Sequence, residues 1–176
     1  MRVFIGIELP EEIKLEVDKF LAPLRKSQKG WENFNDYHQT LFFIGEAQPY
    51  QIEVIEKRLD KISFRPFVLE TSEFKFFSRR IMYLDFKPSL ELLKLNEDIQ
   101  NLFPEWIRLD EKVFLPHVTV KRWQRYEYED LKSGLINREL VSMKFTVSSV
   151  ALFKSEKDLL NNKYHVIYRK SACPEC

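Results

Sequence analysis

The chain has 176 residues, of which 44% are hydrophobic and 31% are charged, and its formal net charge is +1. This length and composition predict one globular domain with a sizeable core. The near-zero charge excludes a protein-wide field that would recruit nucleic acid, so any anion site must be local. No apolar run approaches the roughly 20 residues of a membrane span, and the apolar run at the N-terminus is too short for a signal peptide. We therefore expect a soluble, cytoplasmic protein.

The first half of the chain alternates between strand and helix patterns. Pro10, followed by Glu11 and Glu12, marks a helix start, because proline suits the first turn and the helix dipole favours carboxylates there. The predicted elements are a strand at 2–9, a helix at 10–25, a strand at 38–44, a helix at 50–62 and an irregular strand at 66–78.

The second half repeats this order. We predict a strand at 80–86, a helix from Pro88 that stops at Pro104, a strand at 117–123, a charged helix from about 127, and strands at 143–153 and 163–170. Residues 154–162 are predicted to be an exposed loop. The sequence ends in "CPEC", which lies in a terminal tail rather than at a helix start, so we interpret 171–176 as a mobile tail.

The two halves align with each other. Arg2 falls on Arg80 and Pro10 on Pro88 at an offset of 78, and His38 falls on His117 at an offset of 79. Such a repeat indicates a duplicated structural unit. We therefore predict a single α+β domain over 1–176 with two pseudo-symmetric lobes, built from halves at about 1–78 and 79–170. Its antiparallel sheets would lie centrally, its helices outside, and its two histidine strands would face each other.

Two strings of the form His-x-Thr carry the chemistry. They are His38 with Thr40, and His117 with Thr119, in a chain that has only three histidines and four threonines. Residues i and i+2 of a strand point to the same face, so each histidine shares a face with its threonine. One imidazole can accept a proton while the other donates one, and the hydroxyls can bond phosphate oxygens. This set suits cleavage or formation of a phosphodiester.

Other chemistries fit less well. Catalytic zinc usually has three protein ligands, and the third histidine, His165, precedes no such threonine, so we expect it to have a structural or surface role. The chain has no G-x-S-x-G nucleophile motif and no phosphate-binding P-loop motif. We predict neither a metal ion nor a cofactor.

At these residues the chain resembles the two-histidine (2H) phosphoesterases, and within them the bacterial and archaeal RNA 2′,3′-cyclic phosphodiesterases, also called 2′-5′ RNA ligases. "HQTLFFIGE" is similar to the first motif of that family and "PHVTVKR" to the second. "RVFIGIELPEEI", "SRRIMYLDF" and "VALFKSE…KYHVIYRK" are similar to its opening, central and closing strands. The resemblance covers nearly the whole chain.

The resemblance implies an active-site groove between two lobes and metal-independent hydrolysis of RNA 2′,3′-cyclic phosphates to 2′-phosphomonoesters, with reversible 2′-5′ ligation as a further activity. It implies that His38 is the proton donor to the leaving 3′ oxygen, that His117 is the proton acceptor that activates water, and that Thr40 and Thr119 hold the phosphate. From the residues alone the donor and acceptor cannot be told apart, because the two halves are nearly symmetric.

Three basic residues are further candidates for substrate binding. Arg122 and Arg80 match arginines of the family. Ideal alternation from His117 places Lys121 rather than Arg122 on the groove face, so either a bulge turns Arg122 toward the groove or Arg122 serves packing. The residue between His38 and Thr40 is Gln39, where an apolar residue is common in the family.

Two alternatives stay open at this point. The same chemistry could act on a small nucleotide metabolite or a 2′-5′ oligonucleotide. A non-catalytic module could instead bind RNA ends through a basic and aromatic cluster, which comprises Lys121, Arg122, Trp123, Arg125 and Tyr126. The expected partners are RNA ends or nucleotide 2′,3′-cyclic phosphates. We expect no membrane and no protein partner, and a monomer.

Overall fold

The computed structural model describes residues 1–27, 37–78, 81–106, 113–122, 128–135, 141–157 and 162–175. Its helices are α1 (Glu11–Ser27), α2 (Pro49–Leu59), α3 (Leu90–Leu102) and α4 (Tyr128–Leu135), with a short 3-10 turn at Pro104–Trp106. Its strands are β1 (Arg2–Glu8), β2 (His38–Glu46), β3 (Phe67–Phe77), β4 (Ile81–Phe86), β5 (His117–Arg122), β6 (Lys144–Val147), β7 (Ser149–Lys157) and β8 (Asn162–Ser171). Within these residues, no helix combines the length and the apolar character that crossing a membrane requires.

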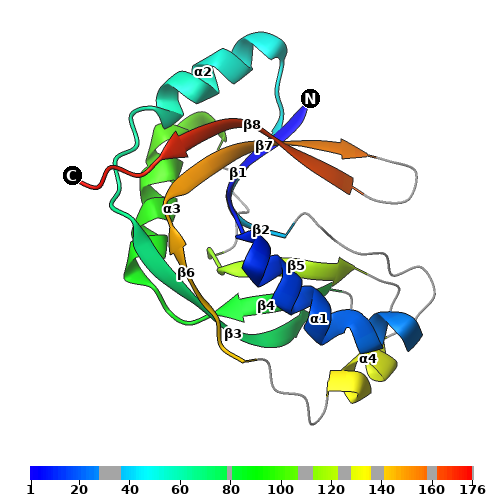
Figure 1. Cartoon of the computed structure of the whole chain (residues 1–176). Coiled ribbons are helices and arrows are strands. Elements are labelled where there is room, and N and C mark those ends of the chain that lie inside the picture. Colours follow the sequence, from blue (N-terminus) through cyan, green and yellow to red (C-terminus); the bar gives the residue numbers. More distant parts are fainter. Residues whose placement is uncertain are drawn as a thin grey trace.

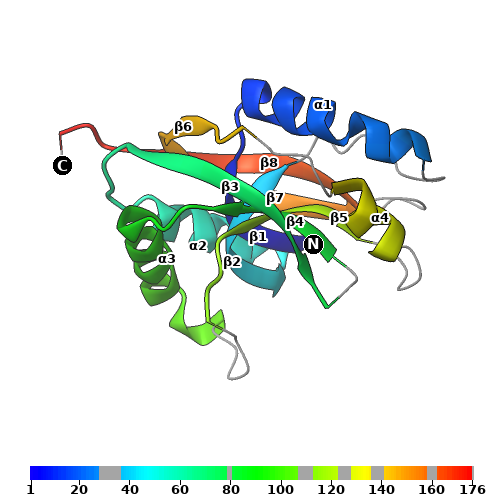
Figure 2. The same cartoon turned by 90° about the horizontal axis from the view of Figure 1, so that it is seen from below.

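The strands form one curled antiparallel sheet in the order β6-β3-β4-β5-β2-β1-β7-β8 (Figure 1). The sequence therefore predicted the α+β class, the central antiparallel strands and the outer helices correctly. Both views place α2 and α3 together, and α1 and α4 together at a different part of the sheet (Figure 2). Leu24 of α1 lies against Gly134 of α4 so closely that a Cβ on Gly134 would meet it at 2.3 Å.

The two lobes do not coincide with the two halves of the sequence. The sheet order is symmetric about the β5–β2 contact, so β2, β1, β7 and β8 make lobe 1 and β5, β4, β3 and β6 make lobe 2. Strand β3 comes from the first half but pairs with β4, and β7 comes from the second half but pairs with β1. The two halves of the sequence thus exchange strands: the first half contributes β3 to lobe 2, and the second half contributes β7 and β8 to lobe 1.

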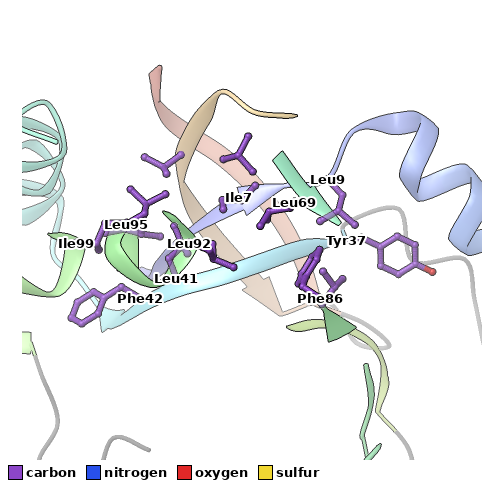
Figure 3. Close-up of a cluster of buried hydrophobic side chains, with 14 of the residues drawn as sticks. Ile7, Leu9, Tyr37, Leu41, Phe42, Leu69, Phe86, Leu92, Leu95 and Ile99 are labelled. Carbon is purple, nitrogen blue, oxygen red and sulfur yellow. The ribbon is translucent and has the colours of Figure 1, made fainter. Parts of the chain in front are cut away.

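The core lies on one face of the sheet, under the helices. Strand β1 contributes Val3, Ile5 and Ile7, which are at most 2% exposed. Figure 3 shows Ile7 and Leu41 from the sheet beside Leu92 and Leu95 from α3. Each such side chain stabilises the fold by about 1.5–3 kcal/mol when fully buried. The side chains of Phe4 and Glu8 lie on the opposite face of β1, beside His38. This face of the sheet lines the groove in which the two histidines lie.

Both histidine strands contain a bulge directly after the threonine. In β2, Leu41 is the extra residue, because Gly6 pairs with Thr40 but Ile5 pairs with Phe42. In β5, Val120 is the extra residue, because Tyr83 pairs with Thr119 but Met82 pairs with Lys121. A bulge reverses which side chains face the groove beyond it. The two bulges lie at equivalent positions of the two lobes.

The bulge in β2 explains the buried Gln39 and Asn96. The side chain of Gln39 donates to the carbonyl of Thr40 at 2.6 Å, and Asn96 of α3 donates to the carbonyl of Leu41, also at 2.6 Å. Irregular pairing removes regular ladder partners from such groups, and an unpaired buried carbonyl costs about 1–3 kcal/mol. Gly6 allows the close approach of β1, since a Cβ there would lie 2.7 Å from the carbonyl oxygen of Gln39.

The C-terminal part of the chain differs from the prediction in three places. Residues 143–153 were predicted as one strand, but β6 and β7 are separate strands that pair with β3 and with β1. The predicted loop at 154–162 is wrong at its start, because β7 continues to Lys157. The tail is attached at its beginning: the amide of Cys173 donates to the carbonyl of Phe64 at 2.9 Å, and Cys173 is disulfide-bonded.

Candidate active site

The two histidine strands lie next to each other in the sheet. Gln39 of β2 pairs with Val118 of β5 in antiparallel register, and both are buried on the core face. One step along each strand places His38 opposite Thr119, and Thr40 opposite His117, with all four side chains on the groove face. Each of the four is half-buried. In this arrangement the two histidines are diagonal neighbours on adjacent strands. Residues in such positions are about 7–8 Å apart, so a phosphate group can fit between the two imidazoles.

A carboxylate lies across from each histidine on the adjoining strand. Glu8 of β1 pairs with His38, and Asp85 of β4 pairs with His117. The strand register therefore makes Glu8 equivalent to Asp85. These two residues are 77 positions apart, whereas the sequence alignment of Arg2 with Arg80 has an offset of 78. Both carboxylates have basic partners: Arg169 lies 2.7 Å from Glu8, and Lys75 lies 2.6 Å from Asp85.

His38 is packed among aromatic rings. Its centroid lies 4.6 Å from the ring of Phe4, 5.4 Å from Phe153 and 4.6 Å from Tyr164. Phe4 and Phe153 are stacked on each other at 4.9 Å. These rings come from β1, β7 and β8, so lobe 1 holds His38 through three strands.

His117 also lies against aromatic rings, and its imidazole makes a polar contact with the backbone. Its centroid lies 5.1 Å from Phe77 and 5.6 Å from Tyr83, and those two rings stack at 4.0 Å. Its Nδ1 lies 2.8 Å from the carbonyl oxygen of Leu115. Because a carbonyl only accepts, Nδ1 carries the proton. A neutral His117 then presents the lone pair of Nε2.

The surroundings of His117 favour its neutral form. Burial lowers the pKa of its imidazole, and the positive charge of Arg122 lowers it further. The hydrogen bond to Leu115 and the charge of Asp85 act in the opposite direction but do not cancel the effect. An imidazole with a lowered pKa is unprotonated at neutral pH and can accept a proton.

The bulge at Val120 decides between the two basic residues that follow it. Arg122 pairs with Ile81, which lies on the groove face of β4 together with Tyr83. Lys121 pairs with Met82, whose side chain is fully buried in the core. The placement of Lys121 on the groove face by ideal alternation is therefore wrong, and Arg122 takes that face instead. Arg80 and the residues Trp123, Arg125 and Tyr126 of the basic and aromatic cluster lie outside the described residues.

Comparison with known proteins places the chain in a family. The family model described as the 2′-5′ RNA ligase superfamily matches residues 10–159. The chain belongs to this superfamily. An RNA 2′,3′-cyclic phosphodiesterase of Thermotoga maritima is 31% identical over 134 residues, which cover 72% of each chain. An RNA 2′,3′-cyclic phosphodiesterase of Archaeoglobus fulgidus is 27% identical, over 93% of this chain and 94% of that protein.

Solved structures share the superfamily fold. The apo form of E. coli LigT superposes with a TM-score of 0.77 at 20% identity, and covers 97% of this chain and 96% of its own. A Thermus thermophilus protein superposes with a TM-score of 0.74 at 21% identity, over 97% of each chain. Both likenesses concern the curled sheet and its helices.

Several groove residues of this superfamily member were not found from the sequence. They are the phenylalanines beside each histidine, Phe153 and Phe77, and the carboxylates opposite them, Glu8 and Asp85. The alternation of β1 and β4 would have placed the carboxylates, but the two phenylalanines lie on exchanged strands and have no local signal. His165 is 54% exposed in its side chain and its Nε2 lies 3.4 Å from Glu156, in keeping with a surface role.

Proposed function

We propose that this chain is an RNA 2′,3′-cyclic phosphodiesterase that opens the cyclic phosphate to a 2′-phosphomonoester without a metal ion. The observation that carries the proposal is the register of β2 and β5, which brings two His-Thr pairs to one groove face. The names of the relatives from Thermotoga maritima and Archaeoglobus fulgidus support the substrate class.

In the proposed reaction His117 is the base. Water gives a proton to Nε2 of His117 as its oxygen attacks the phosphorus, and the Nδ1–H bond to Leu115 keeps the ring oriented. The lowered pKa of His117 supports this role, because the base must start unprotonated. A positioned base of this kind contributes roughly 10²–10⁴-fold to the rate.

His38 supplies the proton on the other side of the phosphate. The bond from phosphorus to the 3′ oxygen breaks, and that oxygen takes the proton from His38, which leaves the phosphate on the 2′ oxygen. Thr40 and Thr119 lie between the two histidines on the same face and bond the non-bridging oxygens. With a 5′ hydroxyl in place of water, the same two histidines in the same roles would catalyse 2′-5′ ligation, and they would exchange roles in the reverse cleavage of the 2′-5′ bond.

The test is product identification in EDTA. The protein is incubated with a short RNA that ends in a 2′,3′-cyclic phosphate and with adenosine 2′,3′-cyclic monophosphate, and the isomeric products are separated by chromatography. We expect a 2′-phosphate from both. A 3′-phosphate would contradict the proposed bond cleavage, because the 2′ oxygen would then be the leaving group, and the absence of any product would contradict the proposed activity.

The same assay addresses the alternatives. A small-nucleotide enzyme would turn over the mononucleotide and leave the RNA end intact, and a binding module would retain the RNA without turnover. The cytoplasmic location and the monomeric state stay predictions.

A further inference from the structure

A cavity of about 320 Å³ opens beside His38 in lobe 1. We call it the β8 cavity; the lining residues that matter here are Glu8, Lys14, Tyr37, Phe153, Tyr164 and Arg169. This volume is at the lower end of the roughly 300–1,000 Å³ of ligand sites. Phe153 and Tyr164 belong both to this cavity and to the rings around His38, so the cavity and the proton donor share a wall.

The polar wall of the β8 cavity offers an acceptor beside a donor. The carboxylate of Glu8 lies 2.7 Å from Arg169 Nη2 and 3.3 Å from Lys14 Nζ. Burial works against ionisation of Glu8, but the hydrogen bonds and charges of Arg169 and Lys14 outweigh it and keep its pKa below the usual value. An ionised carboxylate and a guanidinium side by side match the mixed donor and acceptor edge of a nucleobase.

The charges of this wall do not suit a phosphate. Lys14 is nearly buried, and its amino group is also bonded to Glu11 at 2.7 Å. Lys14 and Arg169 are thus balanced by Glu8 and Glu11, so these four groups carry no net positive charge. Aromatic walls, in contrast, stack on any base.

The direction of the proposed reaction places the nucleoside on the same side. In an in-line displacement the leaving oxygen lies opposite the attacking water. If His38 protonates the 3′ oxygen, the ribose that carries this oxygen lies toward lobe 1, where the β8 cavity opens. We propose that the β8 cavity binds the base of the nucleoside that bears the cyclic phosphate, with Tyr164 and Phe153 as aromatic walls and Glu8 and Arg169 at the base edge. This inference rests on the proposed function.

The first test fills the cavity. Val166 lines it from β8, two residues from Tyr164, and is 37% exposed, so Val166→Trp adds bulk without disturbing the core. Turnover is compared on adenosine 2′,3′-cyclic monophosphate and on base-free ribose 2′,3′-cyclic phosphate. We expect kcat/KM for the nucleotide to fall about tenfold relative to the base-free substrate, in line with the worth of one stacked base. The matched control is Val54→Trp on α2, where the valine is 40% exposed and no residue of the helix lines the cavity; it should not change this ratio.

A fall by the same factor on both substrates, or on neither, overturns the base site. A fall confined to RNA oligonucleotides also overturns it, since the cavity would then hold the upstream phosphate. Binding of 2′-AMP, measured by calorimetry, separates this inference from the proposed function. Weaker binding by Val166→Trp in a protein that hydrolyses neither substrate would support the cavity while contradicting the activity.

A second variant tests the base edge. Glu8→Gln keeps one acceptor oxygen and replaces the other with a donor, so it should change the order of preference among the four cyclic mononucleotides. We expect at least one ratio of kcat/KM to change about fivefold or more, because a wrong edge contact is costly. An equal change for all four bases would overturn the role of Glu8.

Discussion

The two lobes present the same pair of residues in different surroundings. In lobe 2, the imidazole of His117 is hydrogen-bonded to the carbonyl of Leu115, and the positive charge of Arg122 lowers its pKa. In lobe 1, the position equivalent to Arg122 is Phe43, whose ring lies 4.8 Å beneath the guanidinium of Arg2. A duplicated motif therefore supplies two identical side chains, and the neighbours that differ between the lobes can give them unequal roles.

The largest expected effect is on the histidines themselves. His38→Ala and His117→Ala should each lower kcat by about 10²–10⁴-fold, since each removes one proton-transfer group. The comparison is sharpened by the pH profile of the residual activity. His117→Ala should abolish the acidic limb and His38→Ala the basic limb; two identical profiles would contradict the division of roles.

The threonines should behave alike. Thr40→Val and Thr119→Val each remove one hydroxyl from the groove face and keep the shape of the side chain. A hydrogen bond to a charged group contributes about 1.5–3 kcal/mol, so kcat/KM should fall by roughly 10–150-fold in each variant. A loss in one variant only would show that the phosphate is held by a single lobe.

The bulge in lobe 1 can be tested through stability. Asn96→Leu leaves the carbonyl of Leu41 without its partner and should lower the free energy of unfolding by about 1–3 kcal/mol. Urea denaturation measures this. Gln100→Leu is the control, because Gln100 bonds Asn96 rather than the strand. Equal losses in both variants would contradict the account of the bulge.

The smallest expected effects are on the pH profile of kcat/KM, whose acidic limb should shift in opposite directions in two variants. Arg122 lowers the pKa of His117 and Asp85 raises it. Activity is lost as pH falls through this pKa, because the base becomes protonated. Arg122→Gln should therefore move the acidic limb of kcat/KM to higher pH, and Asp85→Asn should move it to lower pH. Shifts in the same direction would show that the limb reports another group.

The sequence was sufficient for the parts of the site that depend on local periodicity. The period of a strand places His38 beside Thr40 without any tertiary information, and the repeated order of elements predicts two lobes. The sequence was insufficient for the features that depend on how strands distant in sequence pair with each other. The exchange of β3 and β7, the bulge that turns Arg122 to the groove, and the approach of Phe153 to His38 all depend on register, which alternation alone does not specify.

The exchange of strands between the two halves of the sequence also has a consequence for how the chain folds. Arg2 pairs with Ser155, so the strand made first during synthesis gains its second neighbour only after most of the chain exists. Contacts between residues so distant in sequence slow folding, because the chain loses the entropy of closing a long loop before the strand pairing stabilises it. Cutting the chain between its halves would leave two fragments that each lack a strand which the other holds. Such fragments should not fold separately, yet they should reconstitute the groove when mixed.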